Sequence, residues 1–367
     1  MLKTMKYRLK PTKTQAKQLD SQLEECRRLY NHFLAERKTA WAERQASLSY
    51  HQQATTLPAL KQERTGLRNV HSQVLQNVAV RIDLAFKAFF RRCKAGEEPG
   101  YPRFRGQGRY DSMTFPQYGN GCQLTEGTLY LSKIGALRVV QHRPLDGTPK
   151  TCTIRRSSTG KWYVTIVCDV EQRPLGQTGA AVGIDVGLTS FYTLSTGEQT
   201  PCPKFLRTDE KDLKRTQRKL SATPKGTIER AKRRTIVARV HERIANRRNN
   251  FAHQESRRLV KRFAVIAVED LSVHRMVHNH CLAKSIVDAA WSQFAAHLAY
   301  KAAYAGKTLV AVSPAYTSQD CSQCGHREPK LLSQRVHHCA CCGVVLDRDH
   351  NAALNILRLG QQSLGFP

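Results

Sequence analysis

The spacing of hydrophobic residues in the first quarter of the chain predicts one strand followed by helices. Residues 3–9 alternate basic and apolar positions, which is typical of a short strand. After a Thr12–Gln15 capping box, apolar residues recur at helical spacing as far as Phe33. A second helical stretch runs roughly from Leu57 to Lys94, with a break near Gly66. Residues 11–95 are therefore predicted to be mostly helical.

From residue 101 to residue 173 the helical spacing gives way to short runs of β-type residues between turn residues. These runs are Ser112–Phe115, Leu129–Leu131, Leu137–Val140, Thr151–Ile154 and Trp162–Val167. We interpret this region as a small β-barrel. Basic and aromatic residues are interleaved along it, a mixture that suits phosphate contacts and base stacking, although the aromatics could equally fill a core and the charges face water.

Two apolar runs in the second half of the chain end in acidic residues. Residues 180–184 lead into Asp185 on a turn between Gly183 and Gly187, and the two glycines permit close approach of other backbone or of a ligand. Residues 263–268 lead into Glu269 and Asp270, which point to opposite faces of a strand, so only one of them can share a face with Asp185. Alone, Asp185 could simply cap backbone amides of its turn.

Helical patterns lie between and after these predicted strands, which indicates an α/β layer. A long basic stretch from Asp209 to Arg262 is broken at residues 221–226 into a helical hairpin. One further helix is predicted through Ile286, Ala290, Phe294 and Leu298, and residues 308–312 form another apolar strand.

Composition adds a strong positive charge to this picture. The 367 residues include 59 Lys and Arg against 29 Asp and Glu, a formal net charge of +30, while 40% of residues are hydrophobic. Folded domains with so strong a positive field indicate a polyanionic partner, of which nucleic acid is the obvious one. No apolar run reaches about 18 residues and no export signal is visible, so we expect an intracellular protein whose 12 cysteines stay reduced.

Four of those cysteines have the spacing of a metal site. Cys321 and Cys324 form one CxxC pair, Cys339 and Cys342 form a second, and 14 residues separate the pairs. This arrangement predicts a tetrahedral Zn²⁺ site of the zinc-ribbon kind, with a structural role because four thiolates leave no open position for chemistry. Less favoured alternative ligands are Cys341, His326, His337 and His338.

A third acidic turn follows this motif and enters a helix at Asp347-Arg-Asp349. Either aspartate could cap the helix. Three acids at the exits of core elements are, however, what a phosphodiesterase with two Mg²⁺ ions needs, because hard oxygen ligands clamp the attacking and leaving oxygens.

The ordered motifs GIDVGLTSF, AVEDLSV, TSQDCSQCG with CACCG, and DRDHNAALNIL, preceded by YRLKPTKTQ, LPALKQE and GYPRFR, resemble the TnpB family of transposon-associated relatives of type V CRISPR effector nucleases. The resemblance covers essentially the whole chain and implies an α/β multidomain fold. A ribonuclease H-like RuvC nuclease domain (177–318 and 344–360) would embed a zinc ribbon (319–343). A β-barrel wedge domain (1–10 and 101–176) would carry an inserted helical recognition domain (11–100), and residues 361–367 would be a short tail.

The resemblance further implies an RNA-guided DNA endonuclease that uses a guide RNA from the transposon end. Such an enzyme cleaves double-stranded DNA beside a short transposon-adjacent motif by two-metal-ion hydrolysis. By motif, Asp185, Glu269 and Asp349 match the catalytic acids that hold two Mg²⁺ or Mn²⁺ ions. The alternatives are an RNA-guided DNA-binding repressor that does not cut and a DDE-type transposase.

The expected partners are a guide RNA and target DNA, bound by one monomer in the prokaryotic cytoplasm and at the nucleoid, without a membrane. The residues predicted to contact nucleic acid are Ser72, Gln73, Gln76, Arg81, Arg103, Arg105, Lys133, Lys161, Arg215, Arg218, Arg233 and Arg234.

Overall fold

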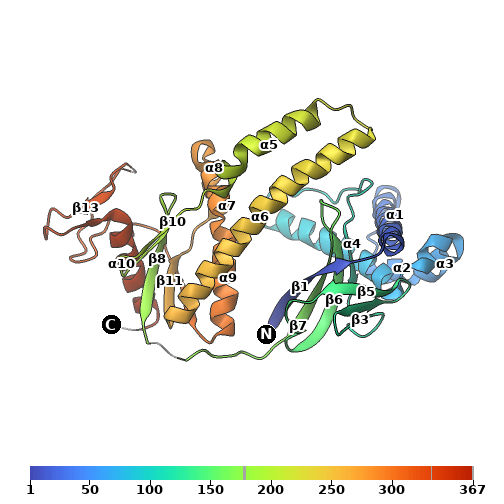
Figure 1. Ribbon diagram of the computed structural model, residues 1–367, viewed down its shortest axis with the longest axis horizontal. Coiled ribbons are helices and arrows are strands. Elements are labelled where there is room, and N and C mark those ends of the chain that lie inside the picture. The colour runs from blue at the N-terminus through green and yellow to red at the C-terminus, as the bar shows by residue number, and fades with distance from the viewer. Residues whose placement is uncertain (177–178, 332, 366–367) are drawn as a thin grey trace. The chain divides into compact units, whose positions relative to one another are not determined.

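The computed structural model describes residues 1–176, 179–331 and 333–365 (Figure 1). The chain divides into two compact units, Met1–Val170 and Glu171–Pro367. Three details of the predicted domain limits lie outside the described residues: the nuclease-domain start at residue 177, residue 332 of the zinc ribbon, and residues 366–367 of the tail.

The helices of the first unit follow the hydrophobic pattern closely. They are α1 (Lys13–Arg44), α2 (Tyr50–Thr55), α3 (Leu57–Glu63), the 3₁₀ helix η1 (Thr65–Asn69) and α4 (Ser72–Lys94). The Thr12–Gln15 capping box is confirmed, because each side chain accepts a hydrogen bond from the backbone N–H of the other residue. The break near Gly66 is confirmed as well. Helix α2, which starts at a second capping box on Ser49, was not predicted, because its six residues are too few to show a period.

One seven-stranded antiparallel sheet completes the first unit. Its strands are β1 (Leu2–Lys10), β2 (Ser112–Phe115), β3 (Cys122–Thr125), β4 (Thr128–Leu131), β5 (Gly135–Val140), β6 (Thr148–Arg156) and β7 (Trp162–Asp169). Their order is β2-β6-β7-β1-β5-β4-β3. Alternate residues of β7 are buried, so one face of the sheet carries the core. A closed barrel is not confirmed, since among the described residues β2 and β3 are unpaired edges.

The second unit contains a five-stranded mixed sheet, as expected for an α/β protein. Its strands are β8 (Ala181–Val186), β9 (Ser190–Leu194), β10 (Gln199–Pro201), β11 (Val265–Glu269) and β12 (Thr308–Val312), in the order β10-β9-β8-β11-β12. Strands β8, β11 and β12 run parallel, and β9 pairs antiparallel with both β8 and β10. The carboxyl ends of β8 and β11 therefore lie side by side.

Helices cover both faces of this sheet (Figure 1). They are α5 (Phe205–Ser221), α6 (Ile228–Arg262), α7 (Val273–Met276), α8 (His280–Ala289), α9 (Trp291–Tyr304) and α10 (Arg348–Ser363), and a hairpin of β13 (Val336–His338) and β14 (Val345–Asp347) precedes α10. Phe191, Phe294 and Leu298 belong to a core that joins one face to α6 and α9. Ala267 and Ile356 belong to a second core, beneath α10 on the opposite face. Within the described residues, no helix is long and apolar enough to cross a membrane.

The prediction of a single helix through Ile286, Ala290, Phe294 and Leu298 is wrong. Ala290 adopts a left-handed conformation, with φ 56°, and separates α8 from α9. Tertiary contacts outweigh the continuous pattern here. The carboxylate of Asp288, near the end of α8, accepts hydrogen bonds from the Leu206 N–H and the Arg248 guanidinium.

Candidate active site and metal centre

Asp185 lies at the carboxyl end of β8 on the face that α10 covers. The neighbouring residue on the same face is Gly183, where an added β-carbon would lie 2.0 Å from the Ala353 carbonyl oxygen. Only glycine permits α10 to pack this closely, so the predicted close approach of other backbone at Gly183 is confirmed. Asp185, two residues further along, faces the same side of the sheet.

Glu269 ends the adjacent parallel strand on the same face. Ala267 pairs with Gly183, and its β-carbon lies where a side chain on Gly360 of α10 would need to go. Glu269 shares the face of Ala267 by strand alternation, whereas the following residue, Asp270, is exposed. The hydroxyl of Thr317 donates a 2.6 Å hydrogen bond to Glu269 Oε1. Of the two neighbouring acids, the structure thus places Glu269 beside Asp185.

Asp349 enters the same region from the first turn of α10. Asp347 caps this helix, since its Oδ1 accepts hydrogen bonds from the backbone N–H groups of Asp349 and His350 at 2.9 and 3.1 Å. The Asp349 carboxylate is therefore not used as the cap, and it lies 3.8 Å from the β-carbon position of Gly187, in the turn after Asp185. The imidazole of His350 contacts the Ser195 carbonyl oxygen at 3.1 Å and fixes the helix start against the β9–β10 turn.

The electrostatics of the three acids fit a divalent cation. Burial raises the pKa of Asp185 well above its usual range, and the charges of Glu269 and Asp349 raise it further. Burial also raises the pKa of Glu269 and of Asp349. Partly buried carboxylates that repel one another are a donor set that a hard cation would neutralise. Arg348, which lowers the pKa of Asp185 and Asp349, offsets only part of the repulsion.

The four predicted zinc ligands are brought together. Cys321, Cys324, Cys339 and Cys342 are free thiols whose sulfur atoms all lie within 4.8 Å of one another. The Cys321–Cys342 and Cys324–Cys339 distances are 3.6 and 3.5 Å, close to the roughly 3.8 Å between sulfurs in a tetrahedral zinc site with 2.3 Å bonds. Backbone N–H groups of Cys342 and Cys341 lower the pKa of Cys339, which favours the thiolate.

Among the described residues this is the single group of three or more His, Cys, Asp or Glu ligand atoms with so short a mutual spacing. The alternative ligands Cys341, His326, His337 and His338 are outside it. The three acids do not form a group of this short spacing.

The nucleic-acid candidates of the first unit differ in how far their side chains are already engaged. Arg81 donates hydrogen bonds to Ser112 and Thr114 and fixes α4 to β2. Ser72 accepts from Lys61, Gln73 donates to Gln117, and the Arg105 guanidinium lies 5.5 Å from the Tyr30 ring centre. The side chains of Gln76, Arg103 and Lys133 are exposed, and Lys161 is half-buried.

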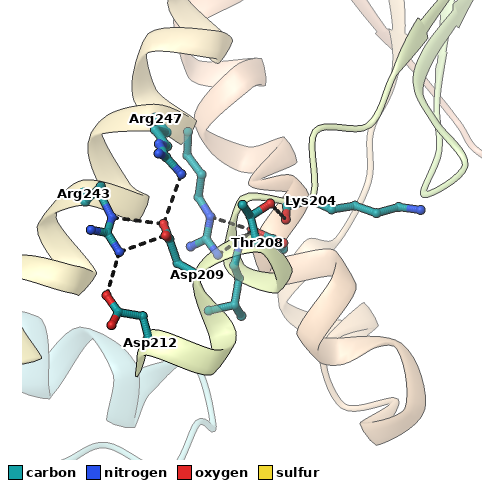
Figure 2. A network of polar contacts seen from close by, with 9 residues as sticks. Lys204, Thr208, Asp209, Asp212, Arg243 and Arg247 are labelled. Atoms are coloured by element: carbon teal, nitrogen blue, oxygen red, sulfur yellow. Dashed lines mark hydrogen bonds and ion pairs between the residues drawn. The ribbon is translucent and has the colours of Figure 1, made fainter. Parts of the chain in front are cut away.

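In the second unit, the arginines of the α5–α6 hairpin fall into two groups. Arg243 and Arg247 both bind the buried carboxylate of Asp209, and Arg243 also binds Asp212, which ties α6 to α5 (Figure 2). The predicted nucleic-acid residues lie nearer the tip. Arg218 and Arg234 are exposed there, while Arg215 pairs with Asp212 and Arg233 with Glu229 on their own helices.

A groove on α5 concentrates positive charge beside this network, which it touches through the Arg215–Asp212 pair. Its volume is about 430 Å³, and its lining residues are Lys211, Lys214, Arg215, Arg218 and Lys219. All five are cationic, and successive members lie on one side of the helix. A surface of this kind attracts a polyanion.

Known proteins resemble this chain along its length. Residues 165–280 match a family described as "Probable transposase", residues 291–356 match the family "Cas12f1-like, TNB domain", and residues 1–46 match one described as a helix-turn-helix domain. A protein of Streptomyces pristinaespiralis is 38% identical over 98% of this chain and 89% of its own length. One of Escherichia coli K12 is 31% identical over 99% and 93%. Both bear the name "Putative RNA-guided DNA endonuclease", and further relatives from a mimivirus are named TnpB-like proteins. The chain belongs to the TnpB family.

A solved structure extends this TnpB-family likeness to the fold. A Cas12f1 chain, determined in a complex with guide RNA and target DNA, aligns with 94% of this chain and 83% of its own length at a TM-score of 0.60 and 15% identity. In the segment matched as a helix-turn-helix domain, the TnpB-family chain has β1 and the single long helix α1.

Sequence reasoning missed three polar residues around the acids of this TnpB-family protein. Thr317, Asn351 and Asn355 are 4%, 0% and 1% exposed. The Thr317 hydroxyl donates to Glu269, and the two asparagines donate to backbone carbonyls in the segment between β12 and the first cysteine. The signal for the asparagines was their i, i+4 spacing, which places both on the face of α10 that also carries Ala352 and Ile356. A lone threonine in a loop carries no such signal.

Proposed function

We propose that this chain is a transposon-encoded RNA-guided DNA endonuclease. It would pair a guide RNA, derived from the transposon end, with one strand of double-stranded DNA and cut beside a short transposon-adjacent motif. The observation that carries the proposal is the convergence of Asp185, Glu269 and Asp349 at the ends of β8, β11 and the start of α10. Likeness along nearly the whole chain to two relatives named as RNA-guided DNA endonucleases supports it.

The finer reading of the fold belongs to the same proposal. We infer that the β10-β9-β8-β11-β12 sheet with its helices is a ribonuclease H-like RuvC nuclease domain, interrupted by the zinc ribbon. The seven-stranded sheet would be the wedge domain, and α1 to α4 would be the recognition domain inserted after β1. The strand order and the insertion of all four helices between β1 and β2 support this division.

Asp185, Glu269 and Asp349 would hold two Mg²⁺ or Mn²⁺ ions, which supply charge neutralisation and an activated water for phosphodiester hydrolysis. The chain's own contribution is to orient these carboxylates. Packing of α10 on Gly183 sets the position of Asp349, and the Thr317 hydroxyl donates a hydrogen bond to Glu269. The thiols of Cys321, Cys324, Cys339 and Cys342 would hold a structural Zn²⁺ just before α10.

The positively charged surface would bind the guide RNA and the target DNA. The five cations of the α5 groove, together with the exposed Arg103, Lys133 and Arg234, are suited to phosphate contacts that read shape and not base identity.

The test is reconstitution with the RNA that copurifies, whose sequenced 3′ end identifies the guide. The ribonucleoprotein is incubated with Mg²⁺ and a plasmid library that carries the target beside a randomised flank. Linear DNA with one enriched flanking motif is expected. Asp185→Asn, Glu269→Gln and Asp349→Asn should each abolish cleavage and keep guide-dependent DNA binding, while Asp270→Asn is the matched active control. Guide-dependent binding of intact DNA by the wild-type protein would favour a repressor, and strand-transfer products without RNA would favour a DDE-type transposase.

A further inference from the structure

Thr317 is a buried threonine whose hydroxyl reaches Glu269 directly. Its Oγ1 lies 2.6 Å from Glu269 Oε1 and 3.3 Å from the Pro314 carbonyl oxygen, and the residue is only 4% exposed. The hydroxyl has one proton to donate, and the shorter distance assigns it to the carboxylate. One oxygen of Glu269 is thereby fixed in direction, and this hydrogen bond lowers the pKa that burial raises.

Thr317 lies in a short connector, residues 313–320, which joins the end of β12 to the first zinc-ribbon cysteine. Two buried asparagines of α10 hold this connector. Asn355 Nδ2 donates to the carbonyl oxygens of Thr317 and Asp320 at 2.9 and 2.7 Å, and Asn351 Nδ2 donates to that of Asp320 at 2.8 Å. The Oδ1 of Asn351 accepts from the backbone N–H of Ser322, the residue after Cys321.

A second set of contacts stiffens the connector from outside. Arg327, within the zinc-ribbon motif, makes two hydrogen bonds to the Asp320 carboxylate, at 2.6 and 3.0 Å. Its guanidinium also lies 3.6 Å from the centre of the Tyr316 ring, and Tyr316 adopts a left-handed backbone conformation with φ 65°. The residue immediately before Thr317 is thus held in a conformation that tyrosine rarely adopts without surrounding contacts.

We propose that Thr317 is a positioning residue that sets the Glu269 carboxylate for divalent-cation binding and couples it to the zinc ribbon. The proposal rests on the proposed function, because it takes Glu269 as a cation ligand. The two strongest supports are the 2.6 Å contact and the asparagine bonds that join Thr317 and Ser322 to the helix of Asp349. One hydrogen-bonded connector therefore links two of the three acids to the cysteine site. A purely space-filling role for Thr317 would need only the volume of its side chain.

The test separates the hydroxyl from the volume of the side chain. Thr317→Val keeps the shape and removes the donor, whereas Thr317→Ser keeps the donor and removes a methyl group. Loss of an outer hydrogen-bond partner of a metal ligand typically weakens metal affinity about 10- to 100-fold. We expect Thr317→Val to weaken Mn²⁺ binding by that factor, and Thr317→Ser to remain near the wild type. Mn²⁺ binding is measured by electron paramagnetic resonance on the zinc-loaded ribonucleoprotein, with Glu269→Gln as the reference for a lost ligand.

Thermal melting and zinc content are measured on the same samples, so that a folding defect is recognised. If Thr317→Val binds Mn²⁺ as the wild type does, or if Thr317→Ser is as weak as Thr317→Val, the positioning role is overturned. Cleavage is recorded separately. A wild-type complex that binds Mn²⁺ and cuts no DNA contradicts the proposed function, yet leaves the comparison of the two Thr317 variants intact as a test of positioning.

Discussion

Gly183 and Ala353 approach so closely that a β-carbon on Gly183 would lie 2.0 Å from the Ala353 carbonyl oxygen and 2.6 Å from the Leu357 backbone nitrogen. Both of these atoms belong to the backbone of α10, so neither can move without the helix. The contact ties the position of Asp349, in the first turn of α10, to the strand that carries Asp185. A small change at Gly183 should therefore act on the site from a distance.

We predict that Gly183→Ala displaces α10 and disables the acid site. The overpacked helix should lower the free energy of unfolding by about 1–3 kcal/mol or more, and cleavage should fall further than this loss of stability explains. Gly176→Ala is the matched control, because a β-carbon there has no atom within 4 Å. Thermal melting and cleavage rates are compared for the two variants. A Gly183→Ala protein as active as the control would show that α10 does not set the site.

Removal of the Asp185 charge should stabilise the protein in buffer without Mg²⁺. Its pKa is raised in the folded state, first by burial and then by Glu269 and Asp349. A carboxyl with a raised pKa contributes stability that is present below the unfolded pKa and is lost as pH rises through the folded pKa. At neutral pH the folded state therefore carries the cost of burying this carboxyl beside two other acids. Asp185→Asn removes that cost and should melt at a higher temperature than the wild type.

Two further measurements check that electrostatics cause the difference in melting temperature between Asp185→Asn and the wild type. The gap in melting temperature should shrink as pH falls below the raised pKa, because the wild-type carboxyl then becomes neutral too. Added Mg²⁺ should raise the melting temperature of the wild type and leave the variant almost unchanged. An Asp185→Asn protein that melts below the wild type at neutral pH without Mg²⁺ would contradict the electrostatic account.

Loss of one zinc ligand should affect both stability and activity. Strand β14 runs from the cysteine site directly into α10, so misfolding there displaces Asp349. Cys324→Ser and Cys339→Ser should each lower zinc content, melting temperature and cleavage, since metal affinity contributes to folding. Cys341→Ser is the control, because Cys341 lies in the same turn and outside the ligand group. Elemental analysis that finds no zinc in active wild-type protein would remove this prediction.

Much of the fold was predictable because its signals are local. The Thr12 cap, the break at residues 221–226 and strand Thr308–Val312 follow from turn residues and periodicity. The CxxC spacing was enough to select four cysteines that the structure brings together. Alternation along β11 was enough to say that one of two acids faces Asp185, although choosing Glu269 required the motif.

What the sequence did not reveal depends on tertiary contacts. The break at Ala290 follows Asp288, whose hydrogen-bond partners Leu206 and Arg248 are distant in the chain. Arg243 and Arg247 belong to the long basic stretch between Asp209 and Arg262, and the sequence does not show that a single acid, Asp209, pairs with both. The role of Thr317 depends on its contact with Glu269, which is 48 residues away in the chain and leaves no local signal.

The last prediction separates basic residues that would contact RNA from those that hold the hairpin together. Each phosphate that the protein neutralises makes the slope of log K against log salt more negative by about 0.7 to 0.9. The double variants Arg103→Gln/Arg105→Gln and Arg233→Gln/Arg234→Gln should thus weaken binding across RNA sequences and flatten the slope by up to about 1.4 to 1.8. Their melting temperatures should stay near that of the wild type. The double variant Arg243→Gln/Arg247→Gln is the matched control, because its arginines pair with Asp209 inside the hairpin.

That control should behave in the opposite way, because it leaves the buried Asp209 carboxylate without its two partners. Loss of both arginines leaves the buried Asp209 charge uncompensated, which lowers stability. The arginines nearer the tip of the hairpin keep their charge. The measurement is a salt titration of fluorescently labelled copurified RNA against each variant, with melting of the RNA-free protein alongside. If the control flattens the salt slope as much as the tip variant does, Arg243 and Arg247 contact RNA despite their carboxylate partner. If the wild-type slope is itself flat, the net charge of +30 serves a purpose other than phosphate binding.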